Sequence, residues 1–90
     1  MSNENTKSIE NVIATLEDNL STVVSTKILI ESRMDLANER KDYYRREKET
    51  ELENAINREV KALYSHLLTL DLQTKQLQSV IKQLKGVALS

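Results

Sequence analysis

The sequence predicts an all-α protein, an extended coiled coil made of two long helical segments. The first observation is the scarcity of turn-forming residues: the chain has no Pro and a single Gly, Gly86, and most turns depend on these two residue types. The second is a pair of apolar series spaced alternately by four and three positions, the spacing of helices that wind around each other. The third is the absence of Phe and Trp, which favours a thin aliphatic core.

Composition argues against several classes of function. A formal net charge of −1 is not that of a strongly basic nucleic-acid-binding protein, so we do not expect a nucleic-acid partner. Without Cys the chain has neither a disulfide nor a thiolate ligand for a metal. It contains no apolar run of membrane-spanning length and no apolar core of a signal peptide. We therefore expect a cytoplasmic location, with a nuclear or cytoskeletal one as the alternative.

The first helical segment is expected over about residues 8–41, after a frayed N-terminus at residues 1–7. Ser8 is a suitable N-cap for it. Residues 8–37 contain the first seam, which we define as the row of heptad positions that faces a neighbouring helix, with one polar position at Lys27. The apolar seam residues are Ile9, Ile13, Leu16, Leu20, Val23, Ile30, Met34 and Ala37, and all of them except Ala37 are expected at a partner interface.

A charged hinge region at residues 38–51 follows. Most of its residues are charged, and only Tyr43 and Tyr44 have large apolar surfaces. Tyr44 occupies the next seam position after Ala37, which makes it an expected interface residue; the alternative is that the two Tyr anchor a partner. The second seam does not continue the heptad register of the first, so the chain must bend, turn or change partners in this region.

The second helical segment is expected over about residues 46–85, and its seam at residues 52–85 has one polar position at Thr74. Its expected interface residues are Ile56, Val60, Leu63, Leu67, Leu70, Leu77, Ile81 and Leu84. Gly86 is expected to end the helix, because Gly tolerates the left-handed conformation of a C-cap. Residues 86–90 would then form an apolar tail.

Leu68 and Leu72 lie outside the second seam, one helical turn apart. A two-stranded coiled coil would leave both side chains in water. A helix that is apolar on more than one side is usually buried by several neighbours. We therefore expect these two residues at a partner interface and the chain in a multi-helix bundle.

Two arrangements of the segments satisfy these observations. The acidic residues of the first part and the basic residues of 60–90 would attract each other in an antiparallel hairpin. The lack of Gly and Pro before Gly86 instead favours one long helix with a kink in its centre. We prefer the long helix on this ground.

No sequence pattern points to catalysis, a cofactor or a metal. His66 is the only His and has no Cys or second His to act with, so we interpret it as a polar contact beside the seam. The Arg40-Lys41 and Arg45-Arg46 pairs are interleaved with acids, which is typical of a solvated helix face rather than a phosphate-binding site. We expect no enzyme activity and no small-molecule substrate.

The remaining interpretation is a protein that binds other proteins. We expect a structural or adaptor subunit of a helical multi-protein assembly. Its partners would be other helical subunits in a hetero-oligomer, or further copies of the chain in a homo-oligomer. The alternative is a small helical-hairpin chaperone or regulator that masks a partner's amphipathic helix. The chain resembles, in its general type, the small coiled-coil subunits of cytoskeletal, trafficking and secretion assemblies. This general resemblance assigns no role to any residue.

Overall fold

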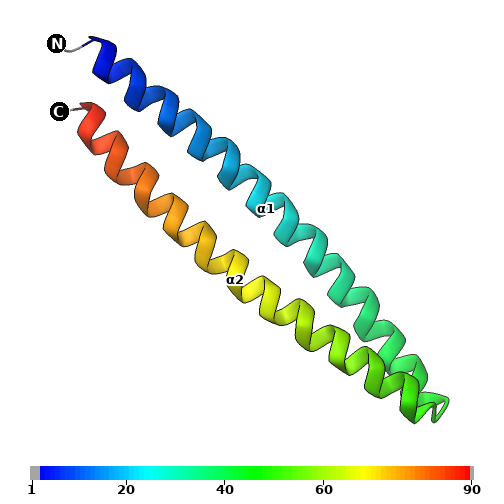
Figure 1. Cartoon of the computed structure of the whole chain (residues 1–90). Coiled ribbons are helices and arrows are strands. Elements are labelled where there is room, and N and C mark those ends of the chain that lie inside the picture. The colour runs from blue at the N-terminus through cyan, green and yellow to red at the C-terminus, as the bar shows by residue number, and fades with distance from the viewer. Residues whose placement is uncertain (1–2, 90) are drawn as a thin grey trace.

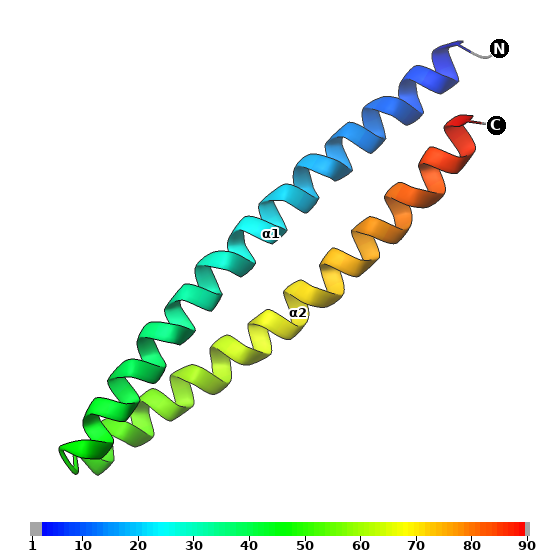
Figure 2. The ribbon, with the colours of Figure 1, turned by 180° about the vertical axis from the view of Figure 1, so that it is seen from behind.

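The computed structural model describes residues 3–89, with side chains from Lys7 onwards, and shows a helical hairpin (Figure 1). Helix α1 spans Asn3–Arg46 and helix α2 spans Thr50–Leu89. The helices lie side by side and antiparallel, as the view from behind also shows (Figure 2), in a rod with extents of 70 × 14 × 13 Å. The all-α fold with two long helices is confirmed, and the hairpin is the arrangement observed.

Our preference for one long helix was wrong, because the chain turns without Gly or Pro. Glu47, Lys48 and Glu49 connect the helices, and Lys48 has the left-handed φ of 58°. The Lys48 amide donates to the carbonyl oxygen of Arg45 at 3.1 Å, and the Glu49 amide donates to that of Tyr44 at 2.8 Å. This pair of hydrogen bonds is a Schellman motif, which ends α1 and reverses the chain.

The same turn begins α2. The carbonyl oxygen of Glu49 accepts the first helical hydrogen bond, from the Glu53 amide at 2.9 Å. Glu51 and Glu53 place negative charge at the positive end of the α2 dipole. The Nε of Arg45, in the last turn of α1, donates to Oε1 of Glu53 at 2.9 Å. The turn therefore lies within the charged region at 38–51, and an ion pair joins the two helix ends beside it.

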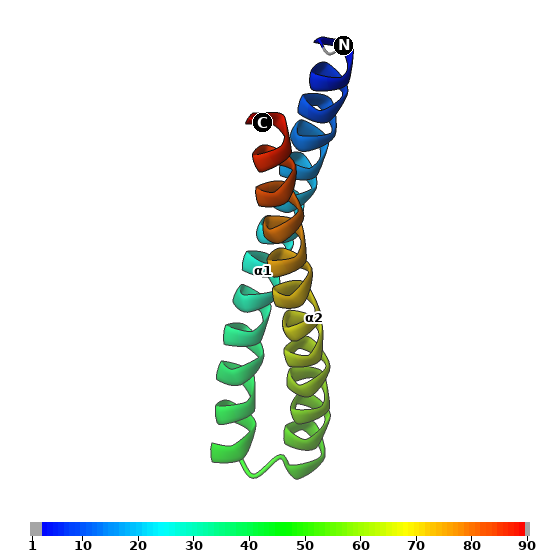
Figure 3. The same cartoon turned by 90° about the vertical axis from the view of Figure 1, so that its left-hand side faces the viewer.

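The two seams face each other between the helices. Partly or fully buried side chains recur along both helices at alternating steps of four and three, as in a coiled coil. Seen from its narrow side, the pair crosses gradually along its length (Figure 3). The buried row of α1 contains Ile9, Ile13, Leu16, Leu20, Val23, Lys27, Ile30, Met34, Ala37, Lys41 and Tyr44. The buried row of α2 contains Glu53, Ile56, Val60, Leu63, Leu67, Leu70, Thr74, Leu77, Ile81, Leu84 and Ala88.

The core between these rows is thin. Among the described side chains the buried apolar residues are Ile13, Ile30, Ala37, Leu70 and Ile81. The chain exposes 6946 Å² of surface, against about 5,400 Å² for a compact protein of its mass. The hairpin thus carries roughly 1,500 Å² more surface than a compact fold would.

Both outer helix ends differ from the prediction. Helix α1 already includes residues 3–7, and Ser8 lies inside it rather than at its N-cap. Helix α2 continues through Gly86, whose φ is not left-handed, to Leu89. For α2 the physical reason is packing against α1: Ala88 is partly buried and lines one groove with Ile13, and this packing outweighs a Gly cost of about 1 kcal/mol. Residues 1, 2 and 90 lie outside the described residues.

Replacing Lys48 by Gly should stabilise the hairpin. A side chain in the left-handed region costs roughly 1–2 kcal/mol, and Gly removes this cost. The greater freedom of Gly in the unfolded chain offsets part of the stabilisation. We expect Lys48→Gly to raise the free energy of unfolding by about 0.5–1 kcal/mol, measured by urea unfolding at one fixed protein concentration. Glu47→Gly is the matched control, since Glu47 has no left-handed φ, and it should not stabilise. Equal effects of the two substitutions would contradict the role of Lys48.

Candidate partner interfaces

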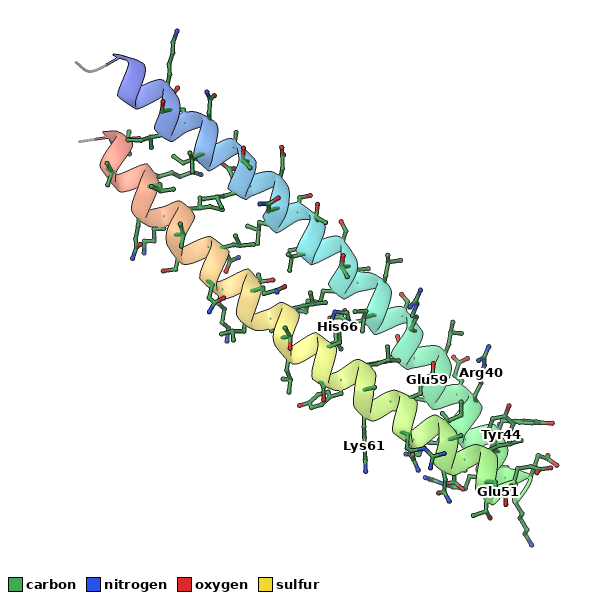
Figure 4. The ribbon with its side chains drawn as sticks, in the orientation of Figure 1. Arg40, Tyr44, Glu51, Glu59, Lys61 and His66 are labelled. Carbon is green, nitrogen blue, oxygen red and sulfur yellow. The ribbon has the colours of Figure 1, made fainter. Side chains whose placement is uncertain are left out.

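The seam residues predicted as a partner interface contact the other helix of the same chain. They lie in the two buried rows, so their first role is to close the hairpin. Tyr44 lies in the seam near the turn (Figure 4). Its ring is 5.7 Å from that of the exposed Tyr43 in an edge-on arrangement. A contact of these residues with a second chain stays a prediction. The surfaces outside the seam are the ones that the hairpin leaves open to a partner.

The hairpin has two faces, one on each side of the seam, which wind along the rod with the helix pair (Figure 3). Residues seven positions apart on a helix return to the same face, so the grooves beside the seam identify each face. One face has a groove of about 360 Å³, lined by Leu16, Asn19, Val23, Gln73, Gln76, Leu77 and Val80. The same face has a second groove of about 270 Å³, lined by Arg33, Leu36, Ala37, Arg40 and Glu59.

We call this side the low-charge face, because between residues 7 and 89 its charged side chains outside the turn are Arg33, Arg40 and Glu59. Arg40 and Glu59 come from opposite helices near the turn (Figure 4). The other positions of this face are apolar or uncharged. His66, seven positions before Gln73, also lies here with an exposed side chain.

Large and small side chains alternate between the helices on the low-charge face. On α1, Leu29 and Tyr43 lie seven residues before and after Leu36 and therefore share its face. All three side chains are more than half exposed. On α2, the residues that precede Gln76 at seven-residue intervals on the same face are small: Thr69, Ala62 and Ala55. The sequence analysis did not identify this face. The signal was available as the repeat of Leu29, Leu36 and Tyr43, but its significance depends on the hairpin register.

The opposite side, which we call the charged face, has grooves of about 330 and 300 Å³ near the chain ends. Their lining residues are Glu10, Ile13, Ala14, Glu17, Leu20, Gln78, Ile81, Lys82, Lys85, Ala88 and Leu89. Acids such as Glu17 and Glu31 follow α1, and lysines such as Lys75 and Lys82 follow α2. The Nζ of Lys85 is 3.8 Å from Oε1 of Glu17. Charge attraction between the two arms, one of the predicted reasons for a hairpin, is therefore visible here.

Leu68 and Leu72 form the exposed apolar ridge on α2 that the sequence indicated. Their side chains are 53% and 56% exposed, and Tyr64, one turn earlier, is 55% exposed. Leu68 belongs to the charged face by its seven-residue spacing from Lys61 and Lys75, and Leu72 lies on the outer side of α2. Neither residue contributes to the buried row, so both remain available to a partner.

An ion pair lies at the polar position of the first seam. The Nζ of Lys27 is 2.6 Å from Oδ1 of Asp71 on the opposite helix. The hydrogen bond to Asp71 and its negative charge raise the pKa of Lys27. One turn of α2 further along the chain, the hydroxyl of Thr74 donates to the carbonyl oxygen of Leu70 at 2.8 Å. Both polar seam positions are thus satisfied, but the partner of Lys27 could not be identified before the register was known.

The described residues contain no group of three or more His, Cys, Asp or Glu residues placed to hold a metal ion. No helix among them combines the length and apolar character needed to cross a membrane. Comparison with protein-family models, curated proteins and solved structures finds no match to this chain.

The Lys27–Asp71 pair predicts a loss of stability at alkaline pH. The pKa of Lys27 is raised above 10.5 in the folded chain, so the contribution is complete below that value and is lost as pH rises through the raised pKa. We expect the urea midpoint of the wild-type chain to fall more than that of Asp71→Asn between about pH 9 and pH 11.5. The control, Glu17→Gln, removes the longer 3.8 Å pair and should retain the decline of the wild type. Parallel curves for the wild type and Asp71→Asn would contradict this assignment.

Proposed function

We propose that this chain is a non-enzymatic structural or adaptor subunit of a helical multi-protein assembly, and that it acts by binding other proteins. The observation that carries the proposal is the contrast between a thin core and apolar exposure on both faces. Five described side chains are buried apolar ones, whereas exposed large apolar residues include Ile28 and Leu68 on the charged face and Leu29 and Leu36 on the low-charge face.

This contrast has a physical consequence for the isolated chain. A single pair of helices buries only one side of each helix, and small folds with little core usually need a disulfide, a metal or association with another chain. The chain has no Cys, and its described part has no metal-binding cluster. Association is therefore the stabilising device that the composition leaves open.

Helical partners fit these surfaces best. Each face has grooves between the two helices, and an amphipathic helix laid into such a groove can cover apolar side chains from both walls. We propose other helical subunits as partners in a hetero-oligomeric, multi-helix bundle. The expected location remains the cytoplasm, on the composition argument alone.

The experiment is sedimentation equilibrium combined with circular dichroism across a range of concentrations. We expect helicity and the apparent free energy of unfolding to rise with protein concentration, because association stabilises the folded chain by mass action. A chain that needs a different partner would instead be poorly helical alone at every concentration. A monomer that is fully helical and unfolds cooperatively at micromolar concentration would contradict the proposal.

A second candidate function is favoured by the hairpin itself. A small helical-hairpin chaperone or regulator would mask a partner's amphipathic helix with the ridge of Tyr64, Leu68 and Leu72. Lysines lie on either side of this ridge: Lys61 extends away from α1 (Figure 4), and Lys75 follows at the other end. A helix with a leucine stripe flanked by acids would complement both the apolar ridge and the lysines.

The double substitution Leu68→Ser and Leu72→Ser tests this second function. Because both side chains are more than half exposed, we expect helicity to be unchanged and the free energy of unfolding to change by no more than about 0.5 kcal/mol per residue. Binding of a synthetic acidic amphipathic helix, followed by fluorescence anisotropy, should be abolished. The control is the double substitution Leu29→Ser and Leu36→Ser on the opposite face, which should leave binding of the synthetic helix intact. Loss of helicity in the first variant would assign the two residues a structural role instead.

A further inference from the structure

We propose that the low-charge face is a homodimer interface, on which a second copy of this chain packs in parallel, with the two turns at one end of the dimer. This inference rests on the proposed interaction function and names one partner for it. The arrangement has a twofold axis along the hairpin. Each α1 then lies against the partner's α2, and the same surface of both copies forms the contact.

The composition of the face is that of an interface. Interface cores are depleted of charged residues, and the low-charge face has only Arg33, Arg40 and Glu59 between residues 7 and 89 outside the turn. The charged face presents acids along α1 and lysines along α2 instead. The two faces belong to the same helices, so this difference in charge is specific to one side.

The register of the hairpin supplies the shape complementarity. The Arg45–Glu53 and Lys27–Asp71 pairs show which residues of the two helices lie at the same height along the rod. Counting the same number of residues from these pairs along each helix places three large residues of α1 at the height of three small residues of α2. The level pairs are Tyr43 with Ala55, Leu36 with Ala62, and Leu29 with Thr69. A twofold axis along the hairpin lays each large residue over the small residue at the same level of the partner. Large side chains then fill the spaces above small ones, as knobs fill holes in packed helices.

Charge selects the same orientation. Glu59 is level with the segment of α1 that carries Arg33 and Arg40, and the three side chains line one groove. In a parallel dimer each Glu59 also faces the partner's arginines, because α2 lies against the partner's α1. In an antiparallel dimer each α1 lies against the partner's α1, and the arginines then face the uncharged end of the face near Val12 and Thr15. Only the parallel arrangement brings opposite charges together.

The available area is sufficient for a stable dimer. A standard interface buries about 800 Å² on each partner. The chain exposes 6946 Å², which is roughly 1,500 Å² more than a compact protein of 10.3 kDa. One face of a rod 70 Å long can therefore supply the required area while the charged face stays in water.

Sedimentation equilibrium of variants of the 90-residue chain tests the interface. Leu36 on the low-charge face and Leu72 outside it are both 56% exposed, so their substitutions form a matched pair. We expect the wild-type chain to be a dimer, Leu36→Glu to weaken dimerisation about tenfold or more, and Leu72→Glu to change it less than about twofold. Circular dichroism at high concentration checks that both variants remain helical. A wild-type monomer, a larger oligomer, or equal effects of the two variants would overturn the proposal.

Ala62→Leu separates specific packing from general stickiness and keeps the test valid if Leu36→Glu unfolds. Leu favours the helix and adds apolar surface, so a non-specific association would become stronger. A fitted interface has no room above Ala62, because the partner's Leu36 occupies it, and dimerisation should weaken. Stronger dimerisation of Ala62→Leu would contradict the proposed contact.

The orientation is measured with a nitroxide label on Glu47→Cys, which is specific because the chain has no Cys. Pulsed electron paramagnetic resonance should give a short label-to-label distance in the parallel dimer. A distance close to the 70 Å rod length would show the antiparallel dimer and refute the proposed orientation. A poorly helical monomer would refute the homodimer but leave the adaptor function intact, whereas a cooperatively folded monomer would refute both.

Discussion

The reversal of the chain at Lys48 is the constraint on which the rest of the structure depends. The left-handed residue and the two Schellman hydrogen bonds direct α2 back along α1, so the helices must be antiparallel. Because only Glu47, Lys48 and Glu49 separate them, neither helix can slide far along the other. The turn thus fixes which seam residues lie level, and the Arg45–Glu53 pair beside it is compatible with this one alignment.

The alignment decides where charge can lie in the seam. Lys27 occupies a position that an apolar residue would fill with more buried area, and it contacts Asp71 instead. A partly exposed ion pair contributes little stability, so its main effect is on specificity. A shift of one heptad would leave Lys27 among apolar side chains without its carboxylate. A single polar seam residue often specifies register in coiled coils at a cost in stability, and Lys27 has that position here.

Much of this architecture could be predicted, because heptad spacing depends only on the order of apolar residues along the chain. The positions that this spacing marks, from Ile9 to Ala37 and from Ile56 to Leu84 with Lys27 and Thr74 among them, lie in the partly or fully buried rows of the two helices. The hairpin was one of the two arrangements considered, but it was not preferred, because Lys48 adopts a conformation usually reserved for Gly or Asn. The helix end at Gly86 was misplaced because packing of the last turn of α2 against α1 outweighs local capping. The exposure of Leu68 followed from its position off the seam.

Contacts between helices could not be predicted in the same way. The pairing of Lys27 with Asp71 and the levels of Leu36 and Ala62 depend on the register, and the register depends on the turn. Local sequence does not encode which residue of a distant helix lies opposite. The low-charge face exists only where the residues at seven-residue intervals on both helices lie side by side. Its composition is present in the sequence, but it is distributed over two segments that the chain must first bring together.

The contrast between the two faces reconciles self-association with an adaptor role. A dimer formed through the low-charge face would cover the side that has few charges and leave both charged faces in water. These two faces, each with Leu68 beside the Lys61 and Lys75 positions, would then point in opposite directions from the twofold axis. One dimer could bind two helical partners at once without competition between its own association and theirs. In this proposal, homo- and hetero-oligomer formation would use different sides of the same two helices.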